Sequence, residues 1–179
     1  MSEAKSYANL ATANSYFGIV SEDIASKRIF NEEKALDSYS NVLFSIVQFW
    51  SSYGVWPRQL TIVSHAFKRR RLVDGHCIAI RFPPHRVHFI GIDPPGMMDG
   101  SNKDAIQGVG EAISQWDRDP HGKGHVLSSK RIQRNPWSVP QTLFPNDQER
   151  SRSGVHCEIL DEGQEYLVDG APQPWSSES

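Results

Sequence analysis

The stretch Leu60–Leu72 constrains the fold most, because a short apolar run changes there into a basic one. Its first four residues are apolar or β-branched, the pair Ser64-His65 interrupts the run, and Lys68–Arg71 are all cationic. A β-branched run that ends at small polar residues predicts a buried strand followed by a turn and a helix. We therefore expect a strand that ends just before Ser64 and a helix over residues 66–80.

The strongest helix signal in the chain lies over Asp37–Tyr53. Its apolar residues recur every three or four positions, and a glycine and a proline follow its end as stop signals. Weaker patterns predict further elements, each shorter or less regular. They are a helix over Ser2–Phe17, a short strand at Arg28–Phe30, a buried strand at Val87–Ile92, a helix from Asn102 or Asp104 to Trp116, and a short basic helix at Val126–Arg134.

Helices and strands that alternate at these lengths predict βαβ units around a mostly parallel sheet. We expect an α/β protein with one domain over residues 1–116. Residues 117–179 are rich in proline, glycine and serine, which predicts an irregular C-terminal extension that is draped on the domain or partly disordered. The rings of Trp137 and Trp175 favour the draped form, because aromatic side chains usually pack on a partner surface.

The composition argues against several classes of protein. A net charge of −2 gives no overall field that would attract nucleic acid or an acidic membrane, so we expect neither partner. Two cysteines, Cys77 and Cys157, are too few for a disulfide framework. The N-terminus lacks a signal-peptide pattern, and the longest apolar stretch, Val42–Trp50, is too short for a bilayer. We expect a soluble, cytoplasmic protein, and the sequence indicates no particular protein partner.

The basic turn after the first strand is the main candidate for a binding site. In an open parallel sheet, ligands bind beyond the carboxyl ends of the strands, and Ser64, His65, Lys68, Arg70 and Arg71 are expected there. The start of the following helix adds backbone N–H groups and the positive end of its dipole. These residues predict a site for a phosphate or a carboxylate. The alternative is a solvated basic helix face whose arginine stems lie on apolar neighbours.

A second polar group, Asp37, Ser38 and Asn41, stands at the start of the strongest helix. Asp37 and Asn41 are four residues apart and therefore share one helix face. If this helix start faces the same crevice, Asp37 and Asn41 are candidate catalytic residues and Ser38 is a candidate ligand-binding residue. Glu32 and Glu33 could join them as general bases. The alternative is that Asp37 caps the helix and its neighbours form a polar face.

We expect no metal site. The pairs His85/His88 and His121/His125 have ligand-like gaps, but the chain has neither Cys-x-x-Cys nor His-Glu-x-x-His. It also lacks a Gly-x-Ser-x-Gly nucleophile turn, a Walker loop and a complete Gly-x-Gly-x-x-Gly after a strand. Common motifs therefore name no reaction.

Several segments together resemble the fungal branch of the domain-of-unknown-function 218 family. They are Ser2–Tyr7, Glu33–Ile46, Tyr53–Pro57, Leu60–Leu72 and Lys130–Trp137. The resemblance covers most of the chain and implies a Rossmann-like three-layer α/β sandwich. Bacterial relatives are linked to envelope biogenesis and lipid-carrier metabolism, and one resembles a binder of S-adenosylmethionine. The resemblance therefore implies S-adenosylmethionine or a nucleotide as a candidate cofactor.

The chain departs from that family pattern at two places. Family members usually begin with an apolar strand that ends in a Ser-Gly-Gly loop just before the first helix, whereas Met1 stands here where that loop would end. The usual Glu-Asn pair is Ser40-Asn41, so one carboxylate is lost. Both departures fall on the expected crevice, and they weaken the case for catalysis more than the case for the fold.

Two functional hypotheses follow from the sequence. The first is an enzyme or former enzyme that acts on a phosphorylated or nucleotide-like small molecule in a basic crevice. Lys68, Arg70 and Arg71 would hold its anion, and Asp37 with Asn41 would orient the reacting group. The second is a non-catalytic binding or scaffold protein, or a truncated and inactive member of the family.

Overall fold

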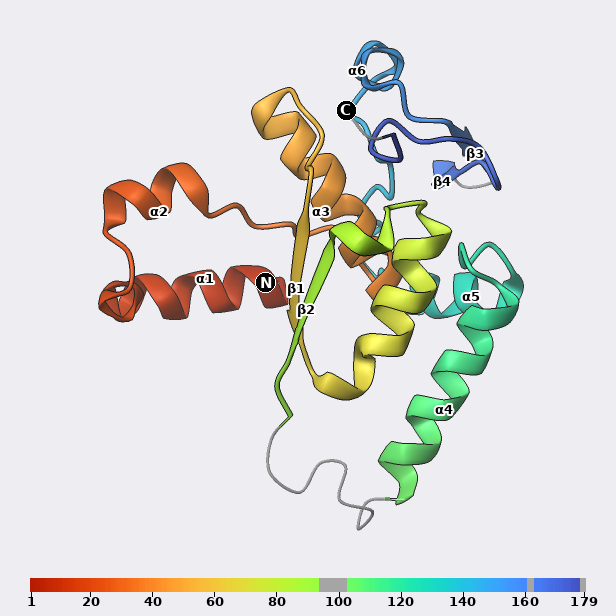
Figure 1. Cartoon of the computed structure of the whole chain (residues 1–179), viewed down its shortest axis with the longest axis horizontal. Coiled ribbons are helices and arrows are strands. Elements are labelled where there is room, and N and C mark those ends of the chain that lie inside the picture. Colours follow the sequence, from red (N-terminus) through yellow and green to blue (C-terminus); the bar gives the residue numbers. More distant parts are fainter. Residues whose placement is uncertain (94–102, 161–162, 178–179) are drawn as a thin grey trace.

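The computed structural model describes residues 1–93, 103–160 and 163–177 of the chain. Figure 1 shows helix α3 beside a pair of strands, an N-terminal arm on one side and the C-terminal third on the other. In the described residues no helix is both long and apolar enough to cross a membrane.

The two central strands are parallel, as the alternation of elements predicts. β1 (Leu60–Ser64) pairs with β2 (Val87–Gly91), with Leu60 opposite Val87 and Ser64 opposite Gly91. One face of the pair packs on the core through Leu60, Ile62, Val87 and Phe89. The other face is exposed, so β2 is half-buried rather than fully buried as expected.

Helix α3 (Ser38–Tyr53) supplies most of the core, and the sequence predicts both of its ends. Asp37 is its N-cap and forms a capping box with Ser40, while Gly54 ends it in the left-handed conformation at φ 71°. The predicted apolar stripe is buried, and Phe44 is buried beside it; the stripe consists of Tyr39, Val42, Leu43, Ile46, Val47 and Trp50.

The connection from β1 to β2 is helical but irregular. It contains a short 3₁₀ turn, η2 (Ala66–Lys68), and a π-helix, η3 (Arg70–Cys77), before a last 3₁₀ turn, η4 (Pro84–Arg86). The segment is helical, as expected for residues 66–80, but it is not one regular helix. A π-helix bonds each residue to the one five positions away and recurs at functional sites, and the mixed apolar pattern of this segment fits that irregularity.

The N-terminal arm differs from the prediction. α1 (Glu3–Ala13) starts at the expected cap, Ser2, but ends four residues early, because residues 15–17 have positive φ. The predicted strand at Arg28–Phe30 is wrong, since Arg28 is the last residue of α2 (Glu22–Arg28). Acidic residues in the first turn of α2 and basic ones in its last turn favour the helix.

The C-terminal third is more regular than an irregular extension. Before it, α4 (Lys103–Arg118) is the expected helix to Trp116; Asn102, one expected cap, lies outside the described part, and Asp104, the other, lies inside the helix. α5 (His125–Arg134) is the expected basic helix. We did not predict α6 (Asp147–Ser153), although its cap Asn146 and Gly154 are local signals, nor the antiparallel pair β3 (Cys157–Ile159) and β4 (Glu165–Leu167).

Two tryptophans of this third lie in opposite environments. Trp175 is 1% exposed and donates its indole N–H to the Ile80 carbonyl at 3.0 Å. Its ring packs edge-on against Trp56, 4.8 Å between centroids. Trp137 is 82% exposed, so the expectation that its ring packs on the domain is wrong.

The chain is thus a mixed α/β protein with a parallel strand pair and a small antiparallel pair. The described residues do not show the expected Rossmann-like three-layer sandwich. Thr61, Val63, His88 and Ile90 form an exposed face of the parallel pair, where a second helical layer would have to pack.

Candidate functional site

A cavity of about 480 Å³ lies at the start of α3. It is bounded by the first turn of α3, by the β1–β2 connection and by helices α4 and α5. Its charged and polar lining consists of Glu3, Asp37, Ser38, Asn41, Lys68, Arg71, Gln115, Lys130 and Arg134. Lys68 and Arg71 of the basic turn therefore line one cavity together with Asp37, Ser38 and Asn41.

Three of the expected binding residues lie elsewhere. Ser64 lines a neighbouring cavity of about 330 Å³ between β1 and α3, which shares Ser38, Asn41 and Lys68 with the first. The ring of His65 lies 3.1 Å from the Ile92 carbonyl oxygen. Arg70 points to the surface, where it forms an exposed ion pair of 3.1 Å with Asp117.

Four cationic residues line the larger cavity, and two of them come from α5. The sequence indicated Lys68 and Arg71, but not Lys130 and Arg134. Lys130 donates to the Gln115 side chain at 2.7 Å, and Arg134 donates to the Leu36 carbonyl at 3.0 Å. Their spacing of four residues on a basic helix was the available signal, because such residues share a face.

Arg71 has the most unusual surroundings of the four. Its side chain is partly buried, and its buried Nε has no hydrogen-bond partner in the part of the chain that the structure describes. Burial lowers the pKa of Arg71, and although Asp37 opposes this shift, the nearby Arg134 cation adds to it. A buried N–H group without an acceptor lowers the stability of the fold. Arg71 is therefore an arginine whose hydrogen-bonding capacity the described residues do not fill.

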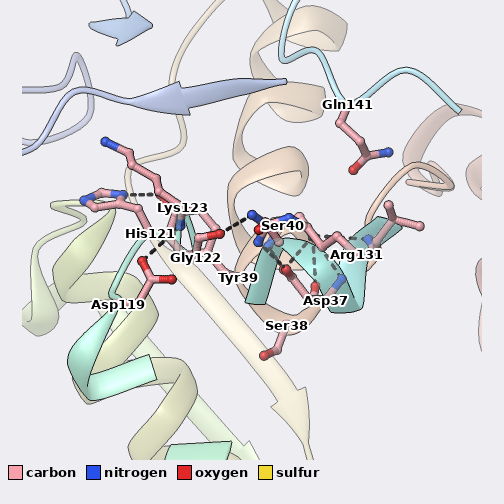
Figure 2. A network of polar contacts seen from close by, with 12 residues as sticks. Asp37, Ser38, Tyr39, Ser40, Asp119, His121, Gly122, Lys123, Arg131 and Gln141 are labelled. Atoms are coloured by element: carbon pink, nitrogen blue, oxygen red, sulfur yellow. Dashed lines mark hydrogen bonds and ion pairs between the residues drawn. The ribbon is translucent and has the colours of Figure 1, made fainter. Parts of the chain in front are cut away.

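Asp37, expected as a catalytic carboxylate, is held on both of its oxygens. Oδ1 accepts from the Ser40 backbone N–H at 2.8 Å, and Oδ2 accepts from Arg131 Nη1 at 2.9 Å (Figure 2). Burial would raise the pKa of Asp37, but the hydrogen bonds from Ser40 and Arg131 outweigh it and hold that pKa below its usual value. The cap and the ion pair account for both oxygens of this carboxylate.

Arg131 is a central residue that sequence reasoning missed. Besides Asp37, it donates from Nη2 to the Gly122 carbonyl and to the Tyr166 hydroxyl, the latter at 2.8 Å. Its side chain is 6% exposed, as is that of Asp37. Arg131 therefore joins α5 to the start of α3 and, through the Tyr166 hydroxyl, to β4.

A second buried contact joins α3 to the π-helix. The Ser38 hydroxyl oxygen lies 2.9 Å from Nε2 of His76, whose side chain is buried. Burial and the Arg71 cation lower the pKa of His76 to about 3, although Asp37 opposes the shift. His76 is therefore neutral at pH 7.

Comparison with known proteins gives one uncharacterised relative. No family model matches the chain, and no solved structure does. Among curated proteins, the uncharacterised protein YOR238W of Saccharomyces cerevisiae is 28% identical over 162 residues. The match covers 83% of this chain and 52% of that protein, so the chain spans about half the length of the relative. This similarity supports a protein of the kind found in fungi and assigns no activity to it.

Proposed function

We propose that the chain binds a phosphorylated small molecule in the cavity at the start of α3. The observation that carries the proposal is that four cations, Lys68, Arg71, Lys130 and Arg134, line this cavity, and that the buried Nε of Arg71 has no hydrogen-bond partner among the described residues. A phosphate in the cavity would accept charge-assisted hydrogen bonds from the Arg71 guanidinium and from the neighbouring cations.

The charge balance of the lining supports an anion. Lys68, Arg71, Lys130 and Arg134 face two carboxylates, Glu3 and Asp37, and Asp37 is already neutralised by Arg131 outside this set. The N-terminus of α3, a helix of 16 residues, adds the positive end of its dipole at the same place. The lining thus favours an anionic ligand over a cationic one.

The size of the cavity supports a small molecule rather than a macromolecule. About 480 Å³ falls within the roughly 300–1,000 Å³ that small-molecule sites usually have. Resemblance to the domain-of-unknown-function 218 family extends the proposal to a Rossmann-like site for a nucleotide, a sugar phosphate or S-adenosylmethionine. These compounds, together with inorganic phosphate, form the panel for the test.

The test is thermal unfolding of the chain with each compound in turn, in wild type and in two adjacent arginine variants. A ligand at about 100 times its Kd stabilises by roughly 2.7 kcal/mol, so a clear shift in Tm is expected. The shift should disappear in Arg71→Met and persist in Arg70→Met, because Arg70 lies outside the cavity. The proposal fails if no compound shifts Tm, or if both variants lose the shift equally.

A further inference from the structure

We propose that Ser38 and His76 form a nucleophile–base pair that transfers a phosphoryl group within this cavity. The inference rests on the proposed function, because it requires a phosphorylated ligand beside Ser38. Nothing in the sequence motifs or in the relative assigns a role to His76.

The geometry of the two residues is that of an activated hydroxyl. Ser38 lines the cavity, and its Oγ lies 2.9 Å from Nε2 of His76, which is 1% exposed. A serine within hydrogen-bond reach of a histidine base is the usual arrangement for covalent catalysis. In the tautomer that carries its proton on Nδ1, Nε2 of His76 accepts the Ser38 proton.

The π-helix explains how one element serves both the anion and the hydroxyl. Arg71 and His76 are five residues apart in η3, and in an α-helix residues at that spacing point about 140° apart. In a π-helix, whose hydrogen bonds span five residues, the same two residues point closer together. Arg71 lines the cavity while His76 contacts Ser38 at its edge.

The proposed step is balanced in atoms and electrons. The Ser38 oxygen attacks phosphorus, the Oγ–P bond forms, and the bond from phosphorus to the leaving oxygen breaks with its electron pair on that oxygen. The Ser38 proton passes to Nε2 of His76, which gives it to the leaving group. Water then attacks the phosphorus of the phosphoserine and gives a proton to Nε2 of His76. The Oγ–P bond breaks with its electron pair on Oγ, which takes that proton back from His76, so that phosphate and the Ser38 hydroxyl are released.

The charge of Arg71 links binding to the strength of the base. In the free protein the Arg71 cation helps to keep His76 neutral, after burial itself. A phosphoryl dianion against Arg71 opposes that effect, because a nearby negative charge favours the imidazolium. His76 therefore becomes a better proton acceptor when the cavity holds its anion.

The experiment uses acetyl phosphate as the phosphoryl donor, since it is small enough for the cavity. Phosphate on Ser38 is measured by mass spectrometry of the intact chain and its peptides, and release of inorganic phosphate is measured in parallel. Wild type should show phosphoserine at position 38, phosphate release, or both. Ser38→Ala should show neither, and His76→Gln should be slower by about 10²–10⁴-fold. Ser51→Ala, an exposed serine of the same helix that lines neither cavity, should behave as wild type.

The outcomes separate this inference from the proposed function. If inorganic phosphate stabilises wild type but neither labelling nor release depends on Ser38, the pair is not catalytic and the anion site stands. If phosphate gives no stabilisation and no reaction, both proposals fail. Unchanged rates in a cooperatively folded His76→Gln chain would also overturn the pair. Should His76→Gln not fold, Ser38→Ala decides, because its hydroxyl lies in the first turn of α3 and is not part of the core.

Discussion

Arg131 on α5 reaches the carboxylate of Asp37 at the start of α3, with 2.9 Å between Nη1 and Oδ2 and both side chains 6% exposed. This ion pair joins α5 to the start of α3, beside the cavity that Asp37 lines. Lys130 and Arg134 flank Arg131 on that helix and line the cavity. The cap of one helix and the placement of two cations on another thus depend on the same contact.

Loss of Arg131 should destabilise the fold strongly. Removal of one partner from a buried ion pair leaves an uncompensated charge and costs about 3–5 kcal/mol, so Arg131→Met should lower the free energy of unfolding by that order in urea titrations. Lys27→Met is the control, because Lys27 and Asp23 form a fully solvated pair with side chains 67% and 73% exposed. Exposed pairs contribute about 0–1 kcal/mol. A cost below about 1 kcal/mol for Arg131→Met would contradict the role given to this contact.

The C-terminal tail should contribute to stability through a single indole. Trp175 is 1% exposed and packs on Trp56, so Trp175→Ala should cost about 3–5 kcal/mol through the cavity that it leaves. Trp137→Ala is the matched control, because its ring is 82% exposed and should be near neutral. Chemical unfolding followed by circular dichroism measures both variants. Equal effects would show that the tail does not stabilise the core in this way.

The sequence predicts elements well where the signal is local. The apolar stripe, N-cap and glycine stop of α3 all lie within the helix or next to it, and they agree with one another. Leu60–Ser64 is a short β-branched run and Val87–Gly91 a short, mostly apolar one, and the parallel pairing follows from the helix between them. The arm at Glu22–Arg28 was missed because its signal lies in the charges at its ends rather than in an apolar stripe.

The candidate site is predicted only in part, because half of its wall comes from far along the chain. Lys68 and Arg71 follow β1 directly, and the rule that ligands bind beyond strand ends finds them. Arg131 contacts Asp37 across 94 residues of sequence. No local pattern contains such a contact. Arg71, and not its neighbour Arg70, lines the cavity, and no local pattern in the basic run distinguishes the two.

Two glycines should respond to alanine in opposite ways. A Cβ at Gly91 would lie 2.7 Å from the Ala66 Cα, so Gly91→Ala must push η2 away from β2 and should cost about 1–3 kcal/mol. A Cβ at Gly108, inside α4, would meet nothing within 4 Å. Gly108→Ala should therefore stabilise by about 1 kcal/mol through helix propensity. Thermal unfolding measures both, and a stabilising Gly91→Ala would rule out the tight contact.

The buried imidazole of His76 should make the protein sensitive to mild acid. Its pKa is lowered from 6.5 to about 3, so between these values the unfolded chain binds a proton that the folded chain does not. Stability therefore rises with pH across this window and is lost as pH falls, by up to about 1.4 kcal/mol per pH unit for one proton. Asp37 adds to the loss only below its usual pKa of 3.8, because its own pKa is lowered further in the fold.

Urea titrations from pH 7 to pH 4 measure how the free energy of unfolding depends on pH. Wild type and His88→Gln, whose side chain is exposed, should show the same slope. In His76→Gln the slope should be smaller by the amount that corresponds to about one proton. An undiminished slope in His76→Gln would mean that the imidazole is not held neutral against Ser38, and the proton transfer proposed for the pair would lose its acceptor.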